Sequence, residues 1–129
     1  MPPLPLRRPT DAELAILRVL WTRGPSTVRQ VAAAMDREGA YTTVLKLLQV
    51  MADKQLVRRD ESDRSHVYEA AFSEDETQQH LVADLLARAF GGSASRLVLH
   101  ALAHATASPE ELEEIRRLVE LHRQKGRQP

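Results

Sequence analysis

Residues 40–51 place two kinds of side chain on opposite sides of a predicted helix. Hydroxyl, amine and amide groups form one side, at Thr42, Thr43, Lys46 and Gln49, and apolar groups form the other, at Val44, Leu48 and Met51. Threonine can donate a hydrogen bond to a phosphate or a base edge, and lysine can reach phosphate or the acceptors of guanine. The pattern therefore predicts that the helix packs through one face and contacts DNA through the other. A solvated face, with Thr42 as a helix cap, is the alternative, and for Gln49 neither role is favoured.

A second polar group stands at the start of the preceding helical segment. Ser26, Thr27 and Arg29 lie where unpaired backbone amides and the helix dipole attract an anion. A DNA phosphate could dock at this position. Capping alone would explain Ser26 and Thr27, whereas Arg29 favours a phosphate contact.

The remainder of the first 72 residues predicts the elements that hold these groups. A capping box at Thr10 and Glu13 opens a helix that Gly24-Pro25 ends, a second helix runs from Ser26 or Thr27 to about Met35, a turn follows at Asp36–Gly39, and the third helix begins near Tyr41. Extended patterns at Lys54–Arg59 and His66–Ala70, joined by a polar loop, predict a hairpin. Three helices followed by a hairpin is the order of a winged helix-turn-helix domain, in which the third helix enters the major groove.

The sequence resembles a known family at several of these motifs. They are the segments 20–31 and 40–48, together with Arg64 and Tyr68 in the wing, and the chain is similar through them to the BlaI/MecI/CopY (penicillinase repressor) group of bacterial repressors. The similarity spans about residues 9 to 72 and continues more weakly to about residue 122. It implies a dimer that binds a palindromic operator and blocks transcription until an inducing signal releases it.

The resemblance also assigns roles in the wing and marks departures. It places basic Arg64 against the DNA, with Arg58 and Lys54 as helpers, although the acidic residues of the loop would repel DNA. Family members commonly carry a basic residue at the position of Val50, a glycine at that of Gln55 and a hydroxyl at that of Lys46. The base sequence that is recognised therefore does not transfer to this chain.

Residues 73–129 are predicted to be wholly helical, in three segments. Without a partner surface such helices bury little, and the resemblance makes this part the dimerisation region. Its expected interface residues are Leu97, Leu102, Leu112, Ile115, Leu118 and Val119. Folding back onto residues 1–72 is the alternative. The predicted domains are thus 1–72, with a flexible arm at 1–9, and 73–129.

In related repressors a membrane metalloprotease sensor triggers cleavage at an Asn-Phe pair in the dimerisation region. Here that pair is replaced by His100-Ala101, so induction could use another bond, another protease or no proteolysis. The same His100 stands four residues before His104, a spacing that metal ligands can adopt, but no carboxylate completes a set, and no metal or other cofactor is expected.

Composition bounds the remaining function classes. The 129 residues include no cysteine, no apolar run long enough to span a membrane and no secretion signal, so a cytoplasmic protein without membrane insertion is expected. No nucleophile elbow, phosphate loop or catalytic carboxylate pair is present, and an enzyme is not expected. The net charge is zero, with 11 basic and 9 acidic residues in 1–72 against 7 and 9 in 73–129. This weak asymmetry keeps a second hypothesis open, a winged-helix module that binds a protein partner and no operator.

Overall fold

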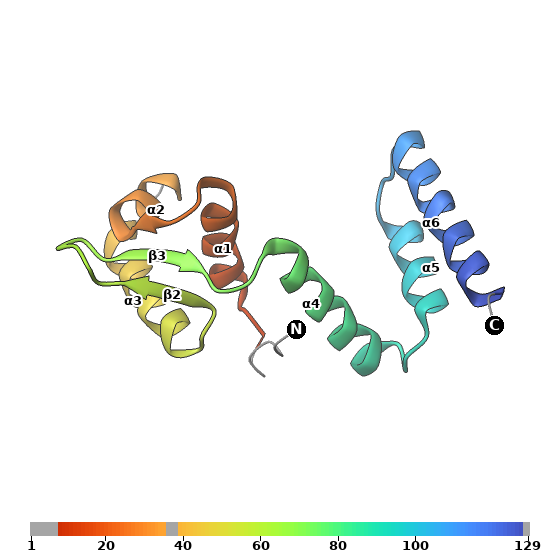
Figure 1. Ribbon diagram of the computed structural model, residues 1–129, viewed down its shortest axis with the longest axis horizontal. Coiled ribbons are helices and arrows are strands. Elements are labelled where there is room, and N and C mark those ends of the chain that lie inside the picture. The colour runs from red at the N-terminus through yellow and green to blue at the C-terminus, as the bar shows by residue number, and fades with distance from the viewer. Residues whose placement is uncertain (1–7, 36–38, 128–129) are drawn as a thin grey trace. The chain divides into compact units, whose positions relative to one another are not determined.

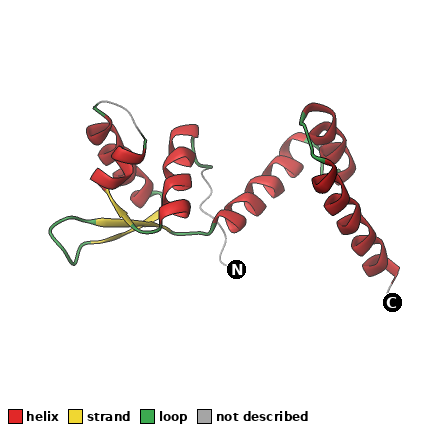
Figure 2. Ribbon diagram, turned by 90° about the horizontal axis from the view of Figure 1, so that it is seen from above, coloured by secondary structure: helices red, strands yellow, loops and turns green. Residues whose placement is uncertain are grey.

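The computed structural model describes residues 8–35 and 39–127, in which helices dominate and strands are short. In chain order the elements are α1 (Asp11–Arg23), β1 (Ser26–Thr27), α2 (Val28–Ala34), α3 (Ala40–Asp53), β2 (Val57–Asp60), β3 (Val67–Ala70), α4 (Glu74–Ala89), α5 (Ala94–His104) and α6 (Pro109–Arg127). The predicted fold class, mainly helical with a small hairpin, is confirmed (Figures 1 and 2). Most of the predicted arm at 1–9 and of the turn at Asp36–Gly39 lies outside the described residues.

The described chain divides into two compact units, one up to Asp84 and one from Leu85 onward. The division falls inside α4 and not at residue 72, where the wing ends. The predicted functional boundary at 72 therefore stays a prediction, with α4 as the element that connects the two units.

Helix α1 begins and ends where local chemistry requires it. The Thr10 hydroxyl accepts a bond of 3.2 Å from the Glu13 amide, and the Glu13 carboxylate accepts one of 2.8 Å from the Thr10 amide. These reciprocal bonds satisfy amides that have no partner within the helix. At the other end Gly24 adopts φ 87°, a conformation that glycine reaches at little cost. The predicted capping box is confirmed.

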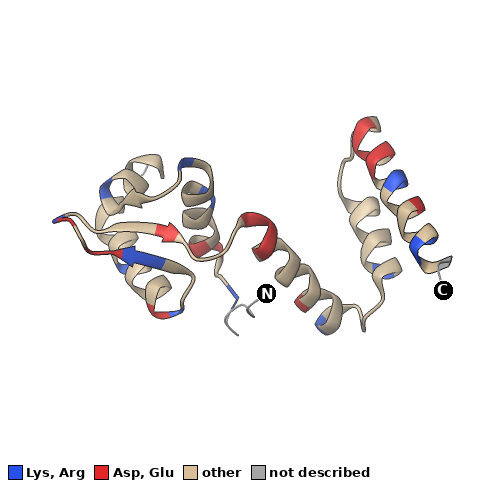
Figure 3. Ribbon diagram, viewed as in Figure 1, with Lys and Arg blue, Asp and Glu red and all other residues tan. Residues whose placement is uncertain are grey.

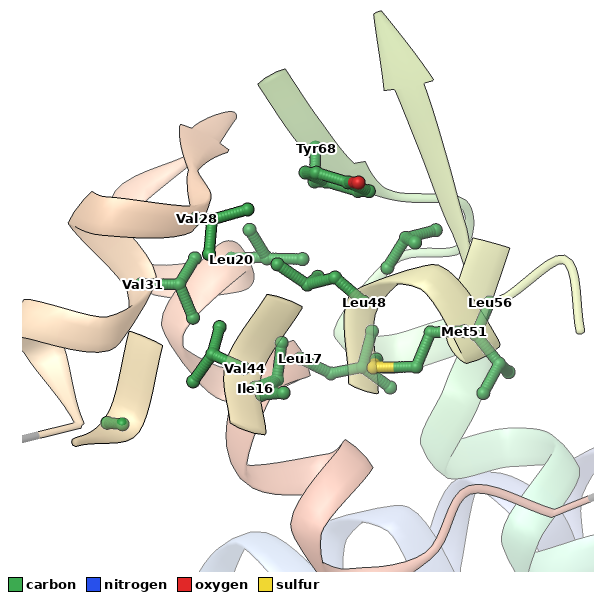
Figure 4. Packing of buried hydrophobic residues seen from close by; sticks show 12 residues of the cluster. Ile16, Leu17, Leu20, Val28, Val31, Val44, Leu48, Met51, Leu56 and Tyr68 are labelled. Carbon is green, nitrogen blue, oxygen red and sulfur yellow. The ribbon is translucent and has the colours of Figure 1, made fainter. Parts of the chain in front are cut away.

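The core of the first unit joins the three helices to the sheet. Helix α1 contacts α2, α3 and β3, and Figure 4 shows their apolar side chains meeting in one cluster. The buried members are Ile16, Leu17, Leu20, Val28, Val31, Ala40, Val44, Leu48, Met51, Leu56, Val57 and Tyr68. Because the apolar stripe of α3 belongs to this cluster, the opposite side of the helix faces outward.

Three strands form the sheet, in the order β1-β3-β2 with antiparallel pairing throughout. The hairpin β2–β3 was predicted, but the pairing of Ser26 with Tyr68 and of Thr27 with Val67 adds a third strand. The loop between β2 and β3 projects beyond the helices (Figures 1 and 2). At the far end of the hairpin, Trp21 Nε1 donates a bond of 3.0 Å to the carbonyl of Phe72.

The first strand of the predicted hairpin, at Lys54–Arg59, begins later than expected. Lys54 is the C-cap of α3, and Gln55 has φ 65°, in the left-handed region. A residue in that region turns the chain out of the helix before a strand can begin, so β2 starts only at Val57. This is the position where the resembling repressors commonly carry glycine.

The second unit consists of amphipathic helices without a buried interior. The Ser93 hydroxyl caps α5, and the Ser108 hydroxyl accepts a bond from the Glu111 amide at the start of α6. Helix α6 continues through Gly126 and ends at Arg127. From Leu85 to Gly126 no described residue is buried. None of the described helices combines the length and apolar character that crossing a bilayer requires.

Candidate nucleic-acid interface

The two faces of α3 differ as the sequence predicted. Val44, Leu48 and Met51 are at most 3% exposed, whereas the polar residues Thr42, Thr43, Lys46 and Gln49 are all exposed. The N-cap of α3 is Gly39, which makes no side-chain capping bond. Thr42 is therefore not a cap, and its hydroxyl stands on the open face. The geometry makes this face available for contact, while its DNA-binding role stays a prediction.

A cleft of about 490 Å³ adjoins this face where α2, α3 and the wing meet. Its lining includes Thr27 of β1, Arg29 of α2, Tyr41 of α3, and Arg64 and His66 of the wing. Three of these were predicted from separate parts of the sequence, and the fold brings them together. Two guanidinium groups and a phenol around one hollow can hold a phosphate, because guanidinium groups bind phosphate strongly and a hydroxyl can add a neutral donor.

Sequence reasoning missed Tyr41 and His66 as candidates for the interface. Tyr41 is 49% exposed although it is a large aromatic residue, and His66 is exposed just before β3. Tyr41 directly precedes the predicted contact residue Thr42, and His66 stands two positions after the predicted contact residue Arg64. Their positions depend on how α3 approaches the wing, and no local pattern reports that approach.

Acidic groups in the wing limit its attraction for DNA. The Asp60 carboxylate accepts a bond of 2.9 Å from the Ser62 amide, and this bond lowers the pKa of Asp60, which keeps the group ionised. Arg59 pairs with Glu61, and the pKa of Arg59 is raised by its bond to Tyr68 and by the Glu61 charge. Figure 3 shows acidic and basic residues side by side along the hairpin. The wing is therefore electrostatically mixed, with Arg64 facing the cleft.

Two predicted residues at the start of α2 have structural partners. Ser26 is 2% exposed and its hydroxyl donates a bond of 2.9 Å to the Gly24 carbonyl. This burial argues against a phosphate contact by Ser26, because pairing of β1 with β3 turns the side chain inward. Thr27 caps α2 in a capping box with Gln30 and also lines the cleft. Arg29 is exposed.

The predicted helpers Lys54 and Arg58 are also engaged within the domain. The Lys54 ammonium lies 2.9 and 3.1 Å from the two carboxylate oxygens of Glu13, and the Lys54 side chain is 19% exposed. Arg58 donates a bond of 2.9 Å to the Ala71 carbonyl. The structure thus gives Lys54 a role inside the fold, and a DNA contact would require it to leave Glu13. Neither residue lines the cleft.

The predicted dimerisation residues carry large apolar side chains outside any core. Leu102 is 42% exposed, Leu112 47%, Leu118 58% and Val119 52%, and Leu97 and Ile115 are partly buried. Further apolar side chains, among them Leu99 at 67%, are open as well. Water is a poor environment for so many apolar groups, and contiguous exposed apolar surface marks an interaction site.

The histidines of α5 stack on each other. The rings of His100 and His104 are 6.0 Å apart with an angle of 8° between their planes, and Phe90 lies 5.7 Å from His100. Across residues 8–35 and 39–127 no three potential ligands of the His, Asp or Glu type gather at a metal-binding distance. The contacts that the structure gives for His100 and His104 are therefore contacts between rings.

Comparisons with known proteins relate the chain to one family of repressors. A family model described as penicillinase repressor matches residues 9–121. The transcriptional regulator BlaI of Mycobacterium tuberculosis is 39% identical over 129 residues, which covers 96% of this chain and 92% of that protein. The penicillinase repressor of Staphylococcus aureus is 20% identical over 110 residues, covering 84% and 87%. The solution structure of apo-NmtR aligns with a TM-score of 0.43 at 28% identity, over 78% of this chain and 70% of that one, a likeness too loose to support a conclusion.

Proposed function

The chain belongs to the penicillinase repressor family, and on that premise we propose that it is a dimeric, sequence-specific repressor of transcription. Each subunit inserts α3 into the major groove of one half of a palindromic operator. The wing lies beside it, and the complex blocks transcription in the cytoplasm until an inducing signal releases the protein. No catalytic role and no cofactor are part of this proposal.

The observation that carries the proposal is that the open face of α3 adjoins the cleft. Thr42, Thr43 and Lys46 present donors that can reach base edges, and Arg29 with Arg64 can hold the neighbouring phosphate backbone. Phosphate contacts fix the register of a protein on the duplex, and base contacts specify the sequence. The surface contains residue types for both tasks within one compact unit.

Dimerisation is proposed from the second unit. Its helices leave apolar residues exposed and bury none, so a second copy of the chain is the simplest partner that supplies an interior. A twofold axis through this unit would present two α3 helices to half-sites about one DNA turn, or a small multiple of it, apart.

The direct test is selection of binding sites from random duplex DNA, followed by titration at several salt concentrations. We expect recovery of a symmetric sequence and an affinity that falls steeply with salt, because neutralised phosphates release counterions. Lys46→Ala is expected to weaken binding and to change base preference. Arg18→Ala, which removes an exposed charge from α1, is the control for net charge and should bind as the wild type does.

The same titration separates the alternative function, a module that binds only a protein partner. The acidic residues Asp60, Glu61 and Asp63 in the wing motivate that alternative. Two results together would favour the protein-binding module over the repressor. They are failure to select any DNA sequence at low salt, and binding to a protein partner with an affinity that hardly changes with salt.

Induction is proposed to act on the second unit, through a membrane metalloprotease sensor or another signal. His100 and Ala101, which stand in place of the Asn-Phe pair of related repressors, lie within α5. A protease needs an extended substrate, so cleavage there would require local unwinding of the helix. Mass analysis of the chain from induced and uninduced cells would show whether any bond is cut.

A further inference from the structure

Val50 is an apolar residue on the face of α3 that the proposed function assigns to DNA. It is 39% exposed. Among the described residues before Leu85, Tyr41, Val50 and Val82 are the large apolar side chains that are exposed, and two of these belong to α3. Tyr41 lines the cleft beside the wing, so Val50 is the exposed apolar residue of α3 that the cleft does not account for.

The position of Val50 along α3 places it among the polar residues of the open face. It follows Lys46 by four residues and Thr43 by seven, spacings that keep side chains on one side of a helix. Lys46 and Thr43 are both exposed. An α3 that lies in the major groove through Lys46 therefore also brings Val50 to the base edges.

The major groove offers one apolar group among its hydrogen-bonding atoms, the 5-methyl group of thymine. A valine side chain has two methyl groups, and it has no donor or acceptor to pair with the polar atoms of the other bases. Resting on this proposed function, we propose that Val50 reads a thymine in each half-site through contact with its 5-methyl group.

The helix geometry also places the thymine relative to the base pair that Lys46 contacts. Four residues of α-helix rise about 6 Å, and successive base pairs are about 3.4 Å apart along the duplex. The thymine should therefore lie roughly two base pairs from the position specified by Lys46, on the side away from Thr43.

The test replaces each thymine of the selected operator in turn by deoxyuridine, which pairs with adenine in the same way but lacks the methyl group. For the wild type, one thymine per half-site should show about a fourfold loss of affinity on replacement, which corresponds to the roughly 0.8 kcal/mol of one buried methyl group. For Val50→Ala the same replacement should have no effect. Val82→Ala, the same substitution at an exposed valine of α4 outside the proposed DNA face, is the matched control and should retain the sensitivity to uracil.

The outcomes separate this inference from the proposed function. If no operator can be selected, the repressor assignment itself fails. If an operator is selected but uracil has no effect anywhere, or its effect persists in Val50→Ala, DNA binding stands and the role of Val50 is overturned. Circular dichroism of Val50→Ala at the assay temperature checks that the variant is folded, which is expected because the side chain lies outside the core.

Discussion

The Lys54 ammonium lies 2.9 Å from Glu13 Oε2 and 3.1 Å from Glu13 Oε1, and the pair joins the first turn of α1 to the C-terminal end of α3. Glu13 is 1% exposed, and its carboxylate also accepts the Thr10 amide. One buried carboxylate thus caps α1 and fixes the end of the helix that carries the candidate DNA face. Both functions depend on the same charge.

Removal of both charges should therefore cost less stability than the two single removals added together. Lys54→Met leaves Glu13 buried without a cation, and we expect the free energy of unfolding to fall by about 3 kcal/mol. The double variant Glu13→Gln/Lys54→Met should lose less than the sum of the single variants, because no unpaired charge stays buried. Urea denaturation of the four proteins measures this coupling. Additive losses would show that the pair contributes little beyond packing.

The pH dependence of stability should carry the signature of Glu13. Burial raises the pKa of Glu13, but the bonds from the Thr10 amide and the Lys54 ammonium outweigh it and hold the pKa below the ordinary value of 4.5. The folded state therefore binds this proton less readily than the unfolded chain. Its contribution to stability is complete above pH 4.5 and is lost as the pH falls through that value towards the lower pKa of the folded state.

Glu13→Gln should accordingly flatten the acid limb of the stability curve. The measurement is the free energy of unfolding between neutral pH and pH values below the ordinary carboxyl pKa. Asp63→Asn, which changes an exposed carboxylate in the wing loop, is the control and should keep the wild-type slope. An unchanged slope in Glu13→Gln would mean that other carboxylates dominate acid unfolding.

Gln55 should be a site where glycine stabilises the protein. Its φ of 65° lies in the left-handed region, which costs a residue with a Cβ about 1 kcal/mol or more. Gln55→Gly removes that cost but raises the entropy of the unfolded chain, and the net gain expected is about 0.5 kcal/mol. Gln55→Val should destabilise the protein by about 1 kcal/mol or more, because a β-branched residue tolerates the left-handed region worst. Thermal denaturation of both variants tests the prediction, and a loss of stability in the glycine variant would contradict it.

The cleft residues should contribute to affinity without reading sequence. Arg29→Ala and Arg64→Ala should each weaken binding to all duplexes and lower the slope of log affinity against log salt by about 1. Tyr41→Phe should weaken binding while the slope stays unchanged, because the lost hydroxyl is neutral. Fluorescence anisotropy over a range of salt concentrations measures both quantities. A changed base preference in either arginine variant would instead assign that residue to base readout.

The apolar face of α6 should hold two subunits together. Val119→Asp places a charge where an interface is proposed, and a twofold axis makes every substitution count twice. We expect the dimer to weaken by at least about 3 kcal/mol, roughly a hundredfold, with parallel loss of operator affinity. Arg117→Ala, on another side of the helix, is the control. Sedimentation equilibrium decides, and a Val119→Asp protein that stays dimeric would place the interface elsewhere.

Local sequence patterns predicted the elements of the fold and the two faces of α3, because these depend on residues a few positions apart. Thr10 and Glu13 predict the start of a helix, and the spacing of Val44, Leu48 and Met51 predicts a buried stripe. Gly24 marks the end of α1 for the same reason. Such signals are complete within one or two helical turns.

Features that depend on distant residues could not be predicted in this way. Glu13 and Lys54 are 41 positions apart, and nothing near Lys54 indicates that its charge turns inward. The inward orientation of Ser26 follows from pairing with Tyr68 in β3. The cleft likewise requires α2, α3 and the wing to meet, so Tyr41 and His66 became candidates only once the fold was known.

The lack of any buried residue from Leu85 to Gly126 bears on how gene control responds to the supply of this protein. If this segment gains its interior only by association, the population of competent dimers at low abundance grows with the square of the chain concentration. Dilution during growth would then relieve repression more sharply than for a regulator that acts as a single chain. Released chains would present these helices to cellular proteases, so that a brief signal could have a lasting effect.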